Sequence, residues 1–491
     1  MEEEKVRVKV HKVLLESERE ELRAKRRRKF LISLLCVLFL IIGLGIGFAA
    51  TSLLRGQSIA AFKTNKLDKI SSYFNSVWLY KDNYEDLEGT MEDKAFYGMT
   101  NFEEDKYSSY MSKKEIEDFA ANINKNYVGI GAQYSYVDNI GTITRVFKES
   151  PAEKGGLLPG DIILKVDGNT VENLTSDEIK DRITGEAGTK VDVTVLRSGK
   201  EVELTFIRNA IEYTAYAETI NDLVYLNIMS FGESTIDECV KYLDPYSDYS
   251  KIIIDLRDNT GGYQGSVQGV AGLFLGKNVV VLNETDNTGK TISYETTVEK
   301  YYDNFKDIVV LVNENTASAA EVLSICLKEQ HPNATLVGTT TYGKGVVQTS
   351  YYLEDGSAIK ITTSDWTSPN GTSIHGVGVK PDVEVYLDDI MYETIYAMNE
   401  ETYEYDSVSN FVRIAEMGLR FLGYDLDRTD GYFDNSFAEA LSKYKIDNEL
   451  TENEVLDKET YEAIISSVIR ENSINEEKDL QLQKAIEILG D

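Results

Sequence analysis

The sequence predicts an α/β core with a small β-rich module inserted ahead of it and helical regions at both ends. Apolar, strand-like runs alternate with helix-like segments between residues 209 and 398. Shorter alternating runs bounded by turn signals fill residues 127–208. Residues 58–126 and 403–491 are mostly helical in pattern. Together these observations predict several domains around one mixed core.

Composition limits the possible partners. With 491 residues, the chain has room for two to four domains. Its net charge of -32 repels nucleic acid, so no nucleic-acid partner is expected. Apolar residues make up 42% of the chain, enough to build cores, which excludes a disordered acidic protein. No Cys/His cluster has metal-ligand spacing, so we expect no metal and no other cofactor.

An apolar run near the N-terminus predicts a membrane anchor. Residues 30–54 carry no charge and are long enough to cross a bilayer. The basic cluster 25–29 precedes the run and only Arg55 follows it, which puts the tail 1–29 in the cytoplasm. A cleaved signal peptide is the alternative, although residues 49–50 form a weak cleavage site. We expect a single-pass protein on the outer face of a bacterial plasma membrane, of a Gram-positive type. The low use of cysteine does not distinguish this location from a periplasm.

The first segment after the anchor, residues 58–126, is predicted to be helical. It contains no proline, and its apolar residues fall at helical spacing. These apolar residues include Leu67, Ile70, Tyr73 and Phe74. The segment could be a spacer, a dimerisation arm or part of the base of the core.

Residues 127–208 contain the signals of a small β-rich domain. Glycines at 129 and 131 open it, and an apolar strand within 158–168 closes on a turn. A capping box at 175–178 begins a helix that carries Ile179 and Ile183 on one face.

In this order the elements resemble a PDZ domain. The resemblance implies that Gly129, Ile130 and Gly131 form a carboxylate-binding loop whose backbone N–H groups hold a peptide C-terminus. It also implies that Ile179 and Ile183 line the peptide groove. A β-barrel that serves only as a spacer is the alternative.

Ser318 is the first candidate catalytic residue. Apolar residues after it repeat at helical spacing, so a helix is predicted to begin at the serine. A nucleophile at a helix N-terminus gains an oxyanion donor from the next backbone N–H, that of Ala319. The alternative is a serine that only caps the helix. The chain has only 3 histidines, so a lysine is the expected activating base.

Lys344 is the candidate base because it lies between Gly343 and Gly345, which permit close approach of substrate. Burial would lower its pKa and leave the amine neutral. Alternation places Gln348 on the same face of the following strand, where its amide could orient the amine without adding charge. A solvated loop lysine is the alternative.

A glycine turn at 255–262 supplies the third candidate element. It follows an apolar strand and ends in Gly261 and Gly262, which could direct a second oxyanion donor into a cleft. The alternative is an ordinary turn in which Asp255 and Arg257 are structural.

Together and in this order, these elements resemble the C-terminal processing peptidases, or tail-specific proteases. Further matches lie at 105–110, 369–374 and 378–382. The resemblance implies a Ser318–Lys344 dyad supported by Gln348, with Gly261, Gly262 and the Ala319 amide at the oxyanion hole. The chain departs from the family pattern at Thr316 and Ala320. It also departs from it in the segment 364–369, and this last difference bears on substrate preference.

The C-terminal segment resembles a peptidoglycan-binding module over residues 407–468. The pattern consists of turn glycines, such as Gly423 and Gly431, and amphipathic helices. A structural helical cap is the alternative.

These observations imply an anchored extracytoplasmic serine endopeptidase. The family resemblance implies that it recognises substrates by exposed C-terminal tails, in envelope-protein processing or signalling proteolysis, and that it could dimerise through 58–126. A Ser-His-Asp protease is excluded because neither His331 nor His375 lies in a matching motif. The non-enzymatic alternative is a wall-tethered PDZ adaptor, which would bind tails without cleaving them.

Overall fold

The computed structural model describes residues 65–398 and 401–490. The predicted tail, 1–29, and anchor, 30–54, lie outside the described residues. Among the described residues, no helix is both long and apolar enough to cross a bilayer. The chain divides into two compact units, residues 1–92 and 93–491.

The described part of the first unit is helical. It contains α2 (Asn65–Val77), the 3-10 helix η1 (Lys81–Asn83) and the beginning of α3 (Leu87–Thr100). The Trp78 ring packs between α2 and the next turn, with its centroid 5.2 Å from Phe74 and 5.5 Å from Tyr84. The predicted helical character of the N-terminal region is confirmed here.

The second unit is centred on a six-stranded sheet in the order β10-β11-β12-β15-β16-β19. β10 is antiparallel to β11, and the remaining neighbours are parallel. The strands are β10 (Ala215–Ile220), β11 (Leu223–Ile228), β12 (Lys251–Asp255), β15 (Asp307–Val312), β16 (Ala334–Gly338) and β19 (Val383–Glu384). A parallel sheet covered on both faces requires apolar residues in both directions, which explains the continuous apolar runs.

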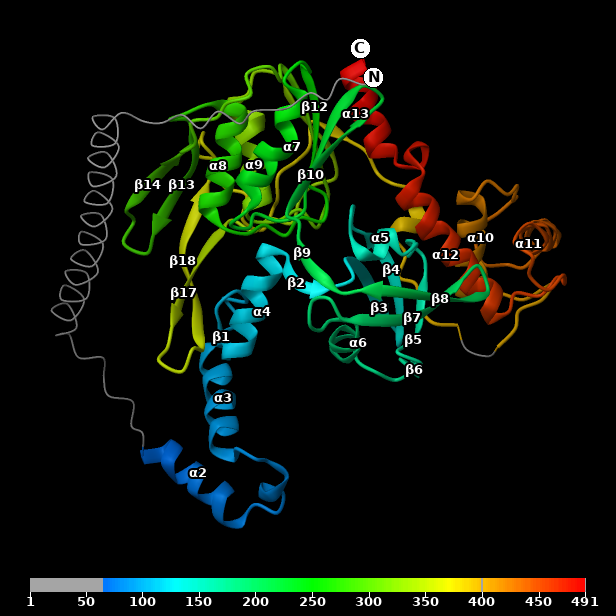
Figure 1. Ribbon diagram of the computed structural model, residues 1–491, viewed down its shortest axis with the longest axis horizontal. Helices are drawn as coiled ribbons and strands as arrows, with labels where there is room; N and C mark the ends of the chain where they lie inside the picture. Colours follow the sequence, from blue (N-terminus) through cyan, green and yellow to red (C-terminus); the bar gives the residue numbers. More distant parts are fainter. Residues whose placement is uncertain (1–64, 399–400, 491) are drawn as a thin grey trace, which may run out of the picture. The chain divides into compact units, whose positions relative to one another are not determined.

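Helices cover both faces of this sheet. On one face lie α7 (Thr235–Leu243), α8 (Gln264–Leu275) and α9 (Ala319–Gln330), side by side in Figure 1. Ile252 and Ile254 of β12 are buried against that layer. Ile253 points the other way and is buried with Leu482 and Leu489 of α13 (Leu480–Gly490). The last helix of the chain is therefore part of the core of the central sheet.

A second sheet carries the strand that follows Lys344. Its order is β1-β18-β13-β14, and β17 pairs with β18. The strands are β1 (Ser109–Met111), β13 (Val280–Asp286), β14 (Thr291–Glu295), β17 (Val346–Tyr352) and β18 (Ala358–Thr367). β1 belongs to the segment 58–126 and is followed by α4 (Lys113–Asn124), so that segment is not wholly helical.

The β-rich module forms its own sheet in the order β3-β4-β5-β7-β8, with β6 on β5. Its elements are β3 (Ala132–Val137), β4 (Ile140–Val146), α5 (Pro151–Lys154), β5 (Ile162–Val166), β6 (Asn169–Thr170), α6 (Ser176–Ile183), β7 (Lys190–Arg197) and β8 (Lys200–Ile207). The predicted capping box starts α6 through Thr175 and Glu178. A two-stranded ladder of β2 (Asn126–Gly129) and β9 (Asn209–Glu212) connects the module to the core.

The C-terminal region is helical but is divided between two cores. Helices α10 (Asn410–Phe421), α11 (Asn435–Asp447) and α12 (Lys458–Ile474) share a hydrophobic core of their own. The helix α13 instead packs on the central sheet. The overall class, an α/β core with a β-rich insert and helical regions at both ends, is as predicted.

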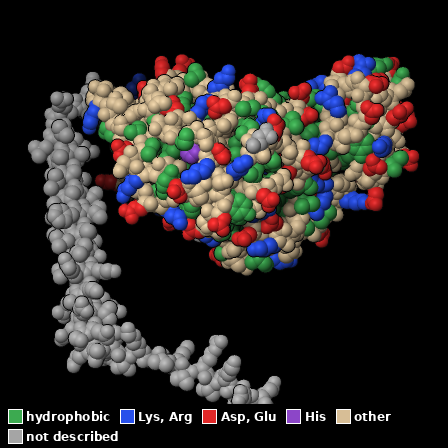
Figure 2. Space-filling model, turned by 90° about the horizontal axis from the view of Figure 1, so that it is seen from above, with side chains coloured by type: hydrophobic (Ala, Val, Ile, Leu, Met, Phe, Trp, Pro, Cys, Tyr) green, Lys and Arg blue, Asp and Glu red, His purple; other side chains and the backbone are tan. Residues whose placement is uncertain are grey.

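The strongly acidic composition does not produce a single acidic face in the view of Figure 2. Lys and Arg side chains are interspersed with Asp and Glu side chains over the visible surface. Mixed charges of this kind favour solubility without creating a large field of one sign on that face.

Candidate active site

Ser318 lies where the chain leaves β15 and enters α9, as the sequence predicts. Its backbone angles, φ 56 and ψ -119, belong to a region that a residue with a side chain rarely adopts. A sharp strand-to-helix turn of this kind presents a serine hydroxyl away from the backbone that carries it. The Ser318 N–H donates to Oε2 of Glu321 at 2.8 Å, which stabilises the strained turn.

Two glycines approach the serine turn closely. A Cβ built on Gly261 would lie 2.8 Å from the Ser318 Cβ and 3.0 Å from the Ala319 nitrogen, so only glycine fits there. The Gly261 N–H already donates to Asn259 Oδ1 at 2.8 Å. Among the described residues, the N–H groups of Gly262 and Ala319 have no acceptor. Of the predicted glycine pair, Gly262 is therefore the one with a free donor.

Lys344 lies in surroundings that favour its neutral form. Burial lowers the pKa of its amine to about 8, and the nearby charge of Lys360 adds to the effect, whereas Glu321 opposes it. The Tyr107 ring covers the ammonium group, with its centroid 5.3 Å from Nζ. Within the described part of the chain, Nζ makes no hydrogen bond or ion pair. These properties are those of a lysine that can accept a proton.

Glu321 connects the serine turn to the lysine turn. It is fully buried on α9, and the oxygen that accepts the Ser318 N–H also accepts the Lys344 N–H at 2.8 Å. Its other oxygen accepts the Gly343 N–H at 2.6 Å and the Thr341 hydroxyl at 2.5 Å. The sequence reasoning missed Glu321, although a Glu three residues after a serine is the spacing of a capping box.

Gln348 lies in β17, as predicted, but its relation to Lys344 is not a simple alternation. The pairing of β17 with β18 shifts register between Val347 and Gln348, so period-two reasoning does not set the direction of the Gln348 side chain. Its amide nitrogen is buried and has no partner among the described residues. The supporting role of Gln348 therefore stays a prediction.

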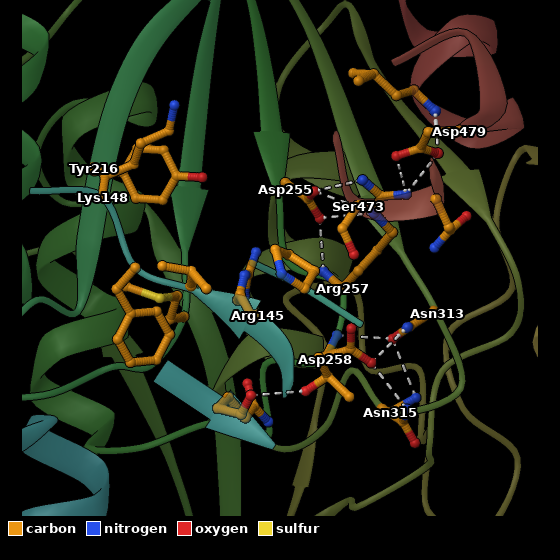
Figure 3. A pocket seen from close by; sticks show the side chains of 18 of the residues that line it. Arg145, Lys148, Tyr216, Asp255, Arg257, Asp258, Asn313, Asn315, Ser473 and Asp479 are labelled. Atoms are coloured by element: carbon orange, nitrogen blue, oxygen red, sulfur yellow. Dashed lines mark hydrogen bonds and ion pairs between the residues drawn. The ribbon is translucent and has the colours of Figure 1, made fainter. Parts of the chain in front are cut away.

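The turn that carries the glycine pair is held at its base by a buried ion pair. Asp255 accepts the Tyr225 hydroxyl at 2.6 Å and the Arg257 guanidinium at 2.7 Å. Burial alone would raise the pKa of Asp255, but the charge of Arg257 keeps it below its ordinary value. Arg257 also donates to Asp479 at 2.8 Å, just before α13 (Figure 3).

Further bonds join the glycine turn to the serine turn. One Asp258 oxygen accepts the side-chain amides of Asn313 and Asn315, each at 2.9 Å (Figure 3). The Ala317 N–H donates to the Asn259 carbonyl at 2.9 Å. The two turns thus form one connected structure around Ser318.

The site opens into a cleft of about 1400 Å³. Ala317, Tyr342 and Lys344 line it from the peptidase core, while Arg145 of β4 and Phe147, just after that strand, line it from the inserted module. A cleft of this size can hold a segment of extended polypeptide.

The two isoleucines predicted to line the peptide groove lie in the hydrophobic core of the inserted module. Ile179 and Ile183 expose only 0% and 8% of their surface, and their contact with a bound peptide stays a prediction. Tyr134 donates from β3 to the Ser176 carbonyl of α6 at 2.7 Å, across the gap between the two elements.

The predicted carboxylate-binding loop, Gly129 to Gly131, contains a backbone conformation that favours glycine. Gly131 has φ 82, and a Cβ there would lie 2.4 Å from the Ser150 Cβ. The Ile130 carbonyl accepts the Ala152 N–H at 2.7 Å, and Gly129 pairs with Asn209 in the β2–β9 ladder. These contacts fix the loop at the start of β3, where a peptide-binding role stays a prediction.

The sequence excludes His331 and His375 from catalysis. In the described part of the chain, neither of these histidines contacts Ser318. His331 caps the far end of α9, so a helix of 12 residues separates it from the serine. His375 lies beside the lysine turn, where its Nδ1 accepts the Gly345 N–H at 3.3 Å. In the described ranges, no group of three or more His, Cys, Asp or Glu side chains could hold a metal ion.

Comparisons with known families match three segments. Residues 222–385 match "Peptidase family S41", residues 142–197 match "PDZ domain", and residues 408–464 match a peptidoglycan binding domain. In chain order, the matches fall on the inserted β-rich module, on the region of the central sheet, and on the helices α10 to α12.

Two curated relatives cover most of the chain. The "Carboxy-terminal processing protease CtpA" of Bacillus subtilis is 32% identical over 473 residues, 95% of this chain and 99% of the relative. A "Probable CtpA-like serine protease" of Staphylococcus haemolyticus is 31% identical over 398 residues, 80% of this chain and 79% of the relative. Among solved structures, the photosystem II D1 C-terminal processing protease is 23% identical, with a TM-score of 0.41 over 64% of this chain and 88% of that one.

A strained serine and a half-buried lysine share one carboxylate in this core, and a relative that is 32% identical covers 95% of the chain. The chain belongs to peptidase family S41 as a C-terminal processing serine peptidase with PDZ and peptidoglycan-binding domains.

Proposed function

We propose that Ser318 is the nucleophile and Lys344 the general base of this peptidase, and that it processes extracytoplasmic proteins selected by their C-terminal tails. The observation that carries the dyad is the shared acceptor. One oxygen of Glu321 accepts the backbone N–H of Ser318 and that of Lys344, each at 2.8 Å. This shared acceptor is the reason to treat the serine turn and the lysine turn, 26 residues apart in sequence (344 minus 318), as one site.

In the proposed reaction, the neutral Lys344 amine accepts the hydroxyl proton of Ser318 as Oγ attacks the peptide carbonyl carbon. The N–H groups of Gly262 and Ala319 stabilise the resulting oxyanion. When the C–N bond breaks, Lys344 gives the proton to the leaving amine. Water then attacks the acyl-enzyme, Lys344 takes its proton, and collapse of the second intermediate returns that proton to Ser318.

The pKa of Lys344 supports this role. An amine with a pKa of about 8 is neutral in about a tenth of molecules at pH 7, whereas an ordinary lysine is neutral in fewer than about one in a thousand. The buried position therefore raises the concentration of the active base by about two orders of magnitude.

The remaining parts of the proposal concern location and substrate choice. The uncharged run 30–54 would anchor the chain, with the peptidase domain outside the cytoplasm. The PDZ domain would bind tails through the loop at 129–131, and the C-terminal domain would bind peptidoglycan. The printed name of the Bacillus relative, a carboxy-terminal processing protease, supports a processing role.

The test is cleavage of an unstructured protein such as casein by the full-length chain. Wild type is expected to cleave, whereas Ser318→Ala, Lys344→Ala and Lys344→Arg are expected to be inactive, since Arg keeps its charge and cannot act as a base. Cleavage that survives Ser318→Ala would reject the assignment. Binding of C-terminal peptides without cleavage by any form would favour a tail-binding adaptor.

A further inference from the structure

Arg145 is a cation without a counter-ion in the cleft beside the proposed dyad. It comes from β4 of the PDZ domain, it is half-buried, and Figure 3 shows its side chain among the residues that line the cleft. Among the described residues, its side chain makes no hydrogen bond and no ion pair. A guanidinium has five donors and no acceptor, so Arg145 offers the cleft donors that no described residue uses.

The other cations of the cleft have roles or partners. Lys148 lies 3.3 Å from Glu218, and Arg257 is bound by Asp255 and Asp479. Lys344 is the proposed base. Arg145 therefore stands apart from its neighbours in the cleft.

A second cation without a partner lies near Arg145. Lys125, the C-cap residue that follows α4, is half-buried, and its side chain also has no partner within the described residues. Burial lowers the pKa of Lys125, and the charge of Arg145 lowers it further, so the two cations repel each other. Two neighbouring cations that form no ion pair with the described residues would both be stabilised by a bound anionic group.

The position of Arg145 indicates which anion would bind. Arg145 pairs across the sheet with Gln133, two residues after Gly131 of the carboxylate-binding loop. Gln133, Arg145 and Lys344 all line the same cleft, whose walls also carry Tyr213 and Tyr216. Tyrosine surfaces suit a polypeptide, and a guanidinium binds a carboxylate through two parallel hydrogen bonds.

We propose that Arg145, assisted by Lys125, binds an acidic side chain of the polypeptide substrate, at a position between the tail held by the PDZ domain and the bond that is cut. This inference rests on the proposed function for the direction of the bound chain. It makes Arg145 a specificity-determining residue, and it predicts a preference for Asp or Glu at one region of the substrate.

Binding to the Ser318→Ala form of the full-length chain tests the proposal without requiring cleavage. The probes are short fluorescent peptides of Ala, Ser and Val with one Glu, which is moved residue by residue inward from the C-terminus. Each has a twin with Gln in place of Glu. At one or two positions the Glu peptide is expected to bind about tenfold more tightly than its twin, the effect of one charge-assisted contact.

Variants identify the residue responsible. Adding Arg145→Gln is expected to reduce affinity for the preferred Glu peptide to that of its Gln twin, and Arg145→Lys to keep part of the difference. Lys148→Gln is the matched control, because Lys148 is a paired cation near the end of the same strand. It is expected to leave the Glu preference unchanged. Thermal melting of each variant confirms that the fold is retained.

Equal binding of the Glu and Gln twins at every position would overturn the proposal, and so would a Glu preference that survives Arg145→Gln. The peptides are also measured with an amidated C-terminus. A third contrary result would be that Arg145→Gln removes the Glu preference for peptides with a free C-terminus but not for the amidated ones. The last result would assign Arg145 to the tail carboxylate instead. An error in the assignment of Ser318 and Lys344 as the dyad is detected separately, because casein cleavage is measured with the chain in which Ser318 is intact.

Discussion

At the scale of single residues, the charge state of Lys344 decides whether the site can work. Burial is the main reason that its pKa falls to about 8, and the charge of Lys360 is the second. Since the base must be neutral, activity should rise with pH and reach half its maximum near pH 8. Below that pH the amine is protonated and cannot accept the serine proton.

Removal of the Lys360 charge provides a test of this balance. Lys360→Met keeps an apolar stem but eliminates the repulsion, so the pKa of Lys344 should rise and the midpoint of the kcat profile should move to higher pH, by up to about one unit. Lys360→Arg keeps the charge and should keep the midpoint. The measurement is kcat against pH on a peptide substrate. A midpoint that stays in place or moves to lower pH in Lys360→Met would contradict the account.

Glu321 is predicted to position both members of the proposed dyad. In Glu321→Gln, the side chain keeps its size but loses the charge and one acceptor oxygen, so four donors compete for one carbonyl oxygen. The expected result is a fall in kcat of about 10- to 100-fold with little change in KM, because geometry is lost and binding surface is not.

The matched control for Glu321 lies on the same helix. Glu329 of α9 accepts hydrogen bonds from Ser368 and Asn370, away from the serine turn. Glu329→Gln should leave kcat near that of the parent. An equal loss in both variants would point to general damage to α9 rather than to positioning.

The sequence predicts the serine turn better than it predicts what holds it. Apolar spacing places the start of α9 at Ser318, and the structure has the helix begin at Ala319. The acceptor of the Gly261 N–H could not be predicted, because Asn259 reaches it only in the folded turn. The complete burial of Ile179 could not be predicted either, because the apolar face of a helix does not say whether a groove beside it is open.

At the scale of elements, the strands of the central sheet follow from local sequence. The apolar runs 251–255 and 308–312 fall within β12 (Lys251–Asp255) and β15 (Asp307–Val312). The bulge between Val347 and Gln348 does not follow, because it depends on pairing with β18. Local propensity sets the existence of a strand, and its partner sets the direction of individual side chains.

The helix α10 contains a carboxyl group that makes its domain sensitive to pH. Glu416 is fully buried; one of its oxygens accepts the Gly431 N–H at 2.8 Å and the other has no partner among the described residues. Burial raises its pKa from 4.5 to about 7. The folded state therefore binds the proton more tightly than the unfolded state, so stability is full below pH 4.5 and is lost as pH rises to about 7.

Glu416→Gln should remove this dependence, because an amide keeps the bond to Gly431 and never ionises. Above pH 7 the variant is expected to be more stable than the parent by roughly 1–3 kcal/mol, and at pH 4 by little or nothing. Calorimetry of the full-length chain at several pH values measures the effect. The exposed Glu439 of α11 gives the control, Glu439→Gln. A variant that is less stable than the parent at pH 8 would contradict the prediction.

At the scale of the whole molecule, the end of the chain completes the peptidase core. Leu482 and Leu489 of α13 are buried against the face of the central sheet that α7, α8 and α9 do not cover. The sequence-based boundary at residue 403 could not reveal this, because the contact joins segments more than 200 residues apart and leaves no local pattern (482 minus 253). The C-terminal helix is therefore inseparable from the sheet that positions the site.

Asp479 connects this helix to the turn that bears the oxyanion glycines. It accepts the Leu482 N–H at 3.0 Å, which caps α13, and the Arg257 guanidinium at 2.8 Å. Asp479→Asn keeps an oxygen for the cap but removes the charge that holds Arg257. Since Asp255 still binds Arg257, the fold should persist, while kcat should fall about three- to tenfold through a looser turn at Gly262. The exposed Glu487→Gln on α13 is the control, as it contacts only Lys484 among the described residues. Steady-state kinetics beside thermal melting decides the matter: a lower melting temperature with unchanged kcat would show that Asp479 only stabilises the fold and does not position the site.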